Sequence, residues 1–140
     1  MIVHCNFEEL RALRQGAQTV LEGTSASEAP VAAPSAERAR VERLLPLLEG
    51  DLTIETLAEQ RSVAGAMETI VAALRAQMES AVVATHPGQE AAVEAYFEFA
   101  HALSVLDRVR EMGEEMEALI ELVTGKPPTP EVARTFVFPD

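Results

Sequence analysis

The chain has 140 residues, of which 48% are hydrophobic and 4% aromatic, and its formal net charge at pH 7 is −12. This length fits one domain, and the negative charge argues against nucleic acids or anionic membranes as partners, because both favour a basic surface. The single cysteine excludes an intramolecular disulfide, the first residues lack a signal-peptide pattern, and no run approaches the roughly 20 apolar residues of a membrane span. We therefore expect a cytoplasmic protein that binds neither nucleic acid nor membrane.

The N-terminal region, residues 1–22, is predicted to hold a short strand and a helix. Residues 2–5 are β-prone, and Asn6 and Glu9 have the spacing of a capping box, which marks a helix start. Apolar residues then recur every three or four positions, and Gly23 is a reasonable stop. This helix should bury one stripe.

Residues 23–34 have the proline-, alanine- and serine-rich composition of a linker. Ser35 can cap the next helix, and Pro46 should kink or end it because proline removes a backbone donor. Asp51, after Gly50, is then expected to cap a new helix.

Two long proline-free runs, 51–85 and 89–124, dominate the rest of the chain and meet at His86-Pro87-Gly88. Both are predicted to be helices of roughly 50 Å, at about 1.5 Å per residue, and so short a turn requires an antiparallel hairpin. We expect residues 35–126 to form the core of an all-α helical bundle, one domain overall, with two shorter helices beside the hairpin. In the tail, 127–140, residues 134–138 are β-prone and could pair with the N-terminal run as a small terminal β-ribbon.

The first long helix has one apolar and one charged side. Placed at 100° steps, one stripe carries Val63, Met67, Val71, Leu74, Met78 and Ala81, and the opposite side carries Arg61, Glu68, Arg75 and Glu79. Arg75 and Glu79 have the spacing of an exposed i,i+4 ion pair. We predict a solvated charged face.

The second long helix changes its apolar side near Ala102. Val93, Tyr96, Ala100 and Leu103 point one way, whereas Val105, Val109, Met112, Met116, Ile120 and Val123 point almost oppositely. One partner helix cannot cover both sides, so its halves should meet different neighbours. The first half would form either a contact with another subunit or part of the chain's own core. The predicted partner-binding residues are Tyr96, Phe97, Phe99 and Leu103.

Glu98-x-x-His101 is the one fragment that resembles a metal motif, since bundle proteins of the di-iron carboxylate type use this spacing. Glu94 lies one turn earlier. A second such motif is missing, so iron bound by Glu94, Glu98 and His101 would require duplication across a dimer. The alternatives are a solvated polar strip and a buried polar pair that fixes helix register. Adjacent His4 and Cys5 are weak evidence for zinc.

The chain shows no internal repeat, glycine-rich phosphate loop or nucleophile elbow. The best-supported function is a non-enzymatic assembly or adaptor subunit that forms a homodimer or higher oligomer and contacts a protein partner, with no cofactor. The alternative is a ferritin-like carboxylate/histidine metal protein. A third hypothesis is a ligand-sensing module whose pocket is lined by the aromatic cluster.

Overall fold

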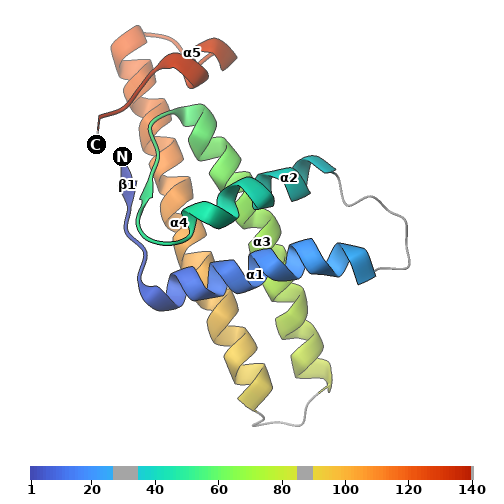
Figure 1. Cartoon of the computed structure of the whole chain (residues 1–140). Helices are drawn as coiled ribbons and strands as arrows, with labels where there is room; N and C mark the ends of the chain where they lie inside the picture. The colour runs from blue at the N-terminus through green and yellow to red at the C-terminus, as the bar shows by residue number, and fades with distance from the viewer. Residues whose placement is uncertain (27–34, 85–89, 140) are drawn as a thin grey trace.

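The fold is a two-layer helical bundle (Figure 1), seen in a computed structural model that describes residues 1–26, 35–84 and 90–139. The elements in chain order are β1 (Ile2–Val3), α1 (Phe7–Ala26), α2 (Ser35–Leu44), the 3-10 helix η1 (Leu45–Leu47), β2 (Leu52–Thr53), α3 (Leu57–Ala84), α4 (Glu90–Thr124) and α5 (Pro130–Thr135). The all-α bundle predicted from the sequence is confirmed.

The body of the molecule is the predicted antiparallel hairpin of α3 and α4, which pack against each other along their length. The helices approach closely at Gly113, where an added Cβ would lie 2.3 Å from the Nε2 atom of Gln60. That amide is buried and donates to the backbone oxygen of Val109 at 2.9 Å. The predicted turn at His86-Pro87-Gly88 lies outside the described residues.

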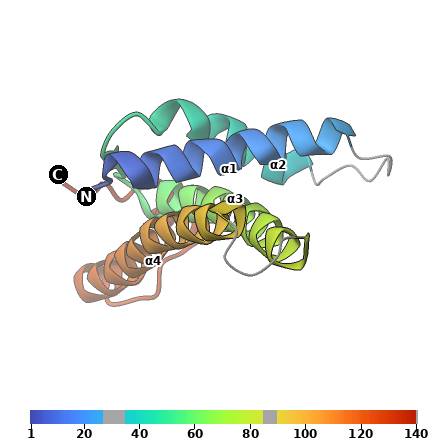
Figure 2. The ribbon, with the colours of Figure 1, turned by 90° about the horizontal axis from the view of Figure 1, so that it is seen from below.

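Helices α1 and α2 form the second layer and lie across the hairpin (Figure 2). Gly16 marks the crossing of α1 over α3, because a Cβ there would meet Ile70 Cγ2 at 2.5 Å and Leu74 at 3.0 Å. Helix α3 is therefore covered by α4 and also by the second layer. Ala66 and Ile70, outside the predicted apolar stripe, are fully buried for this reason.

The predicted helix boundaries hold in part. The Asn6/Glu9 capping box is confirmed, with Glu9 N donating to Asn6 Oδ1 at 2.8 Å and Asn6 N to Glu9 Oε1 at 2.9 Å. Helix α1 continues past Gly23 to Ala26, since a glycine costs a helix only about 1 kcal/mol. Helix α2 begins at Ser35, and it ends at Leu44 before η1, which contains Pro46; the end at Pro46 is as predicted. The remainder of the predicted linker, 27–34, lies outside the described residues.

The predicted start of the first long helix at Asp51 is wrong. The helix begins at Leu57, and Thr56 caps it by accepting a hydrogen bond from Glu59 N at 3.1 Å. The Asp51 carboxylate is instead engaged by the N-terminal segment, accepting from Cys5 N at 3.0 Å. Leu52 and Thr53 are consequently free to form β2.

A small antiparallel ribbon is present, but its partner strand differs from the one expected. Strand β1 pairs with β2, with Ile2 opposite Thr53 and Val3 opposite Leu52. Within the C-terminal run, Arg134 and Thr135 belong to α5, which Thr129 caps, and residues 136–138 that follow it are not part of a strand. The tail still joins this region, where Phe138 is buried and its N–H donates to Glu55 O at 2.7 Å.

The apolar stripes of both long helices lie where the periodicity placed them. On α3 the stripe from Met67 to Leu74 is buried, and the opposite face carries the predicted Arg75–Glu79 ion pair at 3.1 Å. On α4 the second stripe is buried from Val105 to Ile120, but its predicted last member, Val123, is exposed because it lies near the end of the helix. The first stripe of α4 lies outside this core, because the buried residues of α4 begin at Ala102.

Candidate functional site

The C-terminal end of α3 and the N-terminal end of α4 extend beyond α1 (Figure 1). Both ends carry exposed apolar side chains. Val93, Tyr96 and Phe97 occupy one face of α4 because they are three and four residues apart, and they are 49%, 55% and 54% exposed. The rings of Tyr96 and Phe97 meet edge to face, with centroids 5.7 Å apart. Nearby on α3, Val82 and Val83 are also exposed. We call Val93, Tyr96 and Phe97 the aromatic surface.

The four residues predicted to bind a partner are not equivalent in the structure. Tyr96 and Phe97 belong to the aromatic surface, whereas Phe99 and Leu103 are partly buried and pack against the core. The two groups differ because Phe99 and Leu103 lie on a part of α4 that faces the rest of the bundle. Tyr96 and Phe97 are therefore the residues available to contact a partner. Phe99 and Leu103 instead pack this part of α4 against the core.

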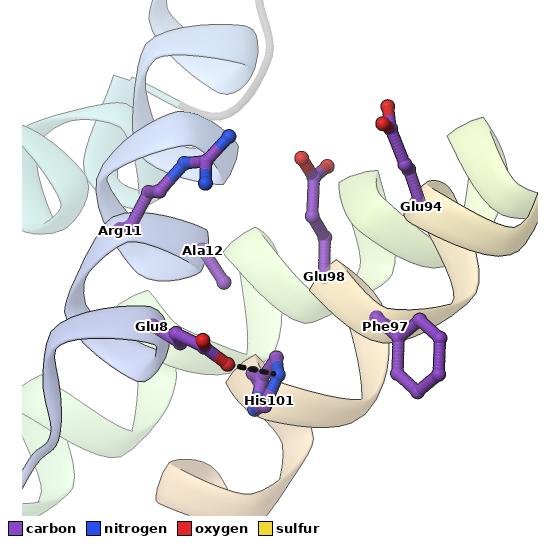
Figure 3. A pocket seen from close by; sticks show the side chains of 7 residues that line it. All are labelled: Glu8, Arg11, Ala12, Glu94, Phe97, Glu98 and His101. Carbon is purple, nitrogen blue, oxygen red and sulfur yellow. Dashed lines mark ion pairs between the residues drawn. The ribbon is translucent and has the colours of Figure 1, made fainter. Parts of the chain in front are cut away.

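An open groove of about 520 Å³ lies between the first turns of α1 and the first half of α4 (Figure 3). Glu8, Arg11 and Ala12 line it from α1, and Glu94, Phe97, Glu98 and His101 line it from α4. His101 Nε2 is 3.2 Å from Glu8 Oε2 and forms an ion pair when the imidazole is protonated. Figure 3 shows the Glu94 and Glu98 carboxylates on one wall and Arg11 on the other.

The structure therefore brings together the three residues of the metal hypothesis, Glu94, Glu98 and His101, along one groove. They do not converge on a point. Within residues 1–26, 35–84 and 90–139, no set of three or more His, Cys, Asp or Glu side chains is arranged to hold a metal ion. A site of the expected kind would need ligands from a second chain, as the sequence analysis required, and the Nε2 atom of His101 already faces Glu8.

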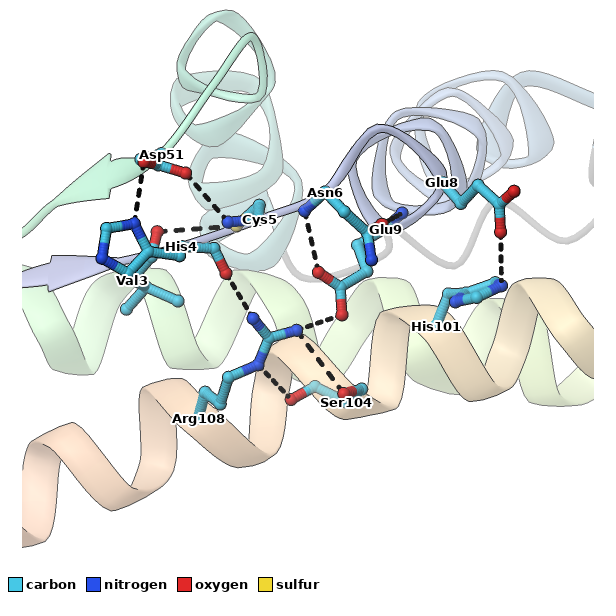
Figure 4. A network of polar contacts seen from close by, with 10 residues as sticks. All are labelled: Val3, His4, Cys5, Asn6, Glu8, Glu9, Asp51, His101, Ser104 and Arg108. Atoms are coloured by element: carbon cyan, nitrogen blue, oxygen red, sulfur yellow. Dashed lines mark hydrogen bonds and ion pairs between the residues drawn. The ribbon is translucent and has the colours of Figure 1, made fainter.

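Arg108 on α4 joins the start of α1 to the hairpin (Figure 4), a role that the sequence analysis missed. Its guanidinium donates to the Glu9 carboxylate and to the backbone oxygen of His4, and its Nε to Ser104 O at 3.2 Å. Glu9 is only 7% exposed, so this pair is screened less than a surface pair. The capping-box pattern locates Glu9, but nothing in the sequence indicates the partner 99 positions away.

The ionisable groups beside Arg108 give no sign of an activated nucleophile. Burial raises the pKa of the Cys5 thiol, with the Arg108 charge opposing this, so the thiol is neutral and a poor nucleophile at pH 7. A hydrogen bond from Cys5 N, followed by the contact with His4, lowers the pKa of Asp51. Asp51 Oδ2 is 2.9 Å from His4 Nδ1. These contacts fix the segment after the N-terminal strand to Asp51, which is a structural role.

Comparison with known proteins finds no match among family models, curated proteins or solved structures. None of the helices in the described part of the chain combines the length and apolar character needed to cross a membrane.

Proposed function

We propose that this chain is a non-enzymatic assembly or adaptor subunit that works through protein–protein contacts, beginning with self-association. The observation that carries the proposal is the aromatic surface, three large apolar side chains about half exposed on one helical face. Aromatic residues are enriched at the centres of protein interfaces, and a few such side chains supply most of the binding free energy. This surface has the composition of a contact site.

The rest of the bundle supports this interpretation, because its core does not require the aromatic surface. The buried residues of α4 begin at Ala102, and Tyr96 and Phe97 are each more than half exposed. A side chain left in water at this position contributes little to folding, whereas the same side chain buried by a second chain would release about 25 cal/mol per Å² of apolar area. Burial of these side chains by a second chain would therefore stabilise an assembly.

The proposal is tested by the mass of the purified protein in solution. Light scattering at micromolar concentration should give at least twice 15.1 kDa. Phe97→Ser should raise the dissociation constant about 30-fold or more, the effect of losing roughly 2 kcal/mol at an interface hot spot. Leu122→Ser is the matched control, since Leu122 is 80% exposed on the same helix at its other end. A monomeric wild type, or equal effects of the two substitutions, would contradict the proposal.

A second candidate is the carboxylate/histidine metal protein, favoured by one observation, the shared groove that Glu94, Glu98 and His101 line. A two-fold dimer that brought two such grooves together could supply the missing ligands. Elemental analysis should then find iron or zinc in a fixed ratio to subunits, retained through chelator washing and lost in His101→Ala but not in His4→Ala. Absence of stoichiometric metal in the wild type would remove this candidate.

A further inference from the structure

A second groove, lined by α2, β2 and the start of α3, combines an apolar floor with positive charge at its rim. Leu44, Leu52 and Ile54 form its buried floor, and the partly exposed Leu47 and Val63 flank it. Arg40 and Arg43 stand on its α2 side. We call this the basic groove.

Its two arginines are unusual in an acidic chain. Arg40 and Arg43 are exposed, and neither forms an ion pair or side-chain hydrogen bond with any described residue. The other charged residue in the lining is Glu59, whose carboxylate accepts a hydrogen bond from Glu55 N at 3.4 Å. The rim is therefore open to an anionic partner in a protein whose net charge is −12.

The size of the basic groove indicates what kind of group it takes. Its volume is about 230 Å³. Small-molecule sites usually enclose roughly 300–1,000 Å³, so this groove suits a single inserted side chain presented by a helix. An acidic helix with one large apolar residue among its carboxylates would match both floor and rim.

The chain itself carries such a helix face. Glu90, Glu94 and Phe97 project from the same side of the first turns of α4, with Glu98 beside them, and we call these four residues the acidic ridge. Phe97 is 54% exposed, and neither Glu94 nor Glu98 forms an ion pair with a described residue. Figure 1 shows the first turns of α4 and helix α2 on opposite sides of α1, so an assembly can use both surfaces of one chain at once.

We infer that the acidic ridge of one copy docks in the basic groove of another, with Phe97 over the apolar floor and Glu94 and Glu98 facing Arg40 and Arg43. The inference rests on the proposed self-association and names its two surfaces. The net charge of −12 makes copies repel one another at long range. A local contact between unlike charges counters that repulsion where the copies meet. Ridge-to-groove contacts give a ring, an open chain or a reciprocal pair.

The test is a charge swap followed by light scattering. The groove variant carries Arg40→Glu and Arg43→Glu, and the ridge variant carries Glu94→Arg and Glu98→Arg. Each should associate about a hundredfold more weakly than wild type, because like charges then face each other across the contact. In an equimolar mixture the acidic ridge of the groove variant meets the basic groove of the ridge variant, and the two reversed surfaces are also of opposite charge, so the mixture should regain the mass of the wild-type assembly. The chain with all four substitutions should regain the wild-type mass.

Matched controls separate this contact from a general effect of charge. The control for the ridge variant is Glu111→Arg with Glu115→Arg, which reverses two exposed acidic residues at the same spacing on α4. The control for the groove variant is Lys126→Glu with Arg134→Glu, which reverses two exposed basic residues. Both should keep the wild-type mass. The milder pair Arg40→Gln and Arg43→Gln tests the groove if charge reversal impairs folding, which circular dichroism would detect, and it should weaken association at least tenfold.

The outcomes distinguish this inference from the proposed function. A wild type that associates while the groove and ridge variants keep its mass would overturn the ridge-to-groove contact and leave self-association standing. Failure of the mixture to form a complex would also overturn it, because the two surfaces would then not meet each other. A wild type that is monomeric at all concentrations would overturn both.

Discussion

Replacing Gly113 with alanine should destabilise the protein, although alanine is the better helix former. The helix itself gains about 1 kcal/mol from the substitution. The new Cβ, however, would lie 2.3 Å from Gln60 Nε2 and 2.5 Å from its Cδ, so the buried amide must move. Overpacking costs about 1–3 kcal/mol and loss of the hydrogen bond to Val109 a further 1–3 kcal/mol. The net change in the free energy of unfolding should be a loss of about 1–5 kcal/mol.

The cause can be tested in a double-mutant cycle by urea denaturation followed by circular dichroism. In a Gln60→Ala background the atoms that clash with the new Cβ are gone. Gly113→Ala should there stabilise the protein by up to about 1 kcal/mol, the helix propensity term alone. The effect of Gly113→Ala on the free energy of unfolding should thus be a loss when Gln60 is present and a gain when it is replaced by alanine.

Gly65→Ala is the matched control on α3. A Cβ at Gly65 would meet only the flexible end of Arg40, with Nη1 at 3.1 Å, so this substitution should be stabilising in the wild type. Stabilisation by Gly113→Ala equal to that by Gly65→Ala would refute the close approach of α3 and α4 on which this reasoning depends.

Three further predictions concern stability. Leu74→Ala should lower the free energy of unfolding by about 2–5 kcal/mol, because Leu74 is 1% exposed, whereas Glu68→Ala on the charged face should change it by at most about 0.5 kcal/mol. Arg108→Met should cost about 1–3 kcal/mol by removing the cationic partner of the buried Glu9 carboxylate, and Arg61→Met, in an exposed ion pair, about 0–1 kcal/mol. Asp51 has a lowered pKa in the folded state, owing to a backbone N–H and then the adjacent imidazole. Its stabilisation is present above the unfolded pKa and lost as the pH falls through the folded pKa, so Asp51→Asn should reduce the acid dependence of the melting temperature.

Each of these predictions has a result that would count against it. Equal losses from Leu74→Ala and Glu68→Ala would mean that the helical phase of α3 is wrong. An Arg108→Met protein as stable as Arg61→Met would show that the carboxylate at the start of α1 does not depend on its partner in α4. An unchanged acid limb in Asp51→Asn would show that the contacts of Asp51 form in the unfolded chain as well.

The sequence predicted the hairpin well because both long helices are periodic over many turns. The i,i+3/i+4 spacing on α4 placed Val105 to Ile120 in the core, and the change of side near Ala102 is matched by the change from exposed to buried residues. Local hydrogen bonds were equally predictable at Asn6 and Glu9, since the capping box is complete within four residues.

The errors arose where tertiary contacts override local preference. Asp51 is a good helix cap by type, but its carboxylate is taken by Cys5 and His4, 46 and 47 positions away. The β-prone C-terminal run was predicted to pair with the N-terminal strand, but α5, capped by Thr129, takes its first two residues and the partner of β1 is β2. Such competition between a local and a distant partner cannot be read from periodicity.

The candidate surfaces show the same limit. The aromatic residues were identifiable, but only the packing of Phe99 against the core separates it from exposed Phe97. The basic groove could not be predicted, because nothing in the sequence indicates that Arg40 and Arg43 lie beside residues of β2 and α3. Helical periodicity shows on which face of a helix a residue lies, but not which other element packs against that face.

The most direct test of self-association through the aromatic surface uses the chain's lone tyrosine. Because the protein has one tyrosine and no tryptophan, its intrinsic emission comes from Tyr96. Acrylamide quenching of that emission should increase as the protein is diluted below the association midpoint found by light scattering, because Tyr96 is 55% exposed in the single chain and should be covered in the assembly. Quenching that stays constant while the mass falls would place the contact elsewhere, and a mass of 15.1 kDa at every concentration would contradict self-association itself.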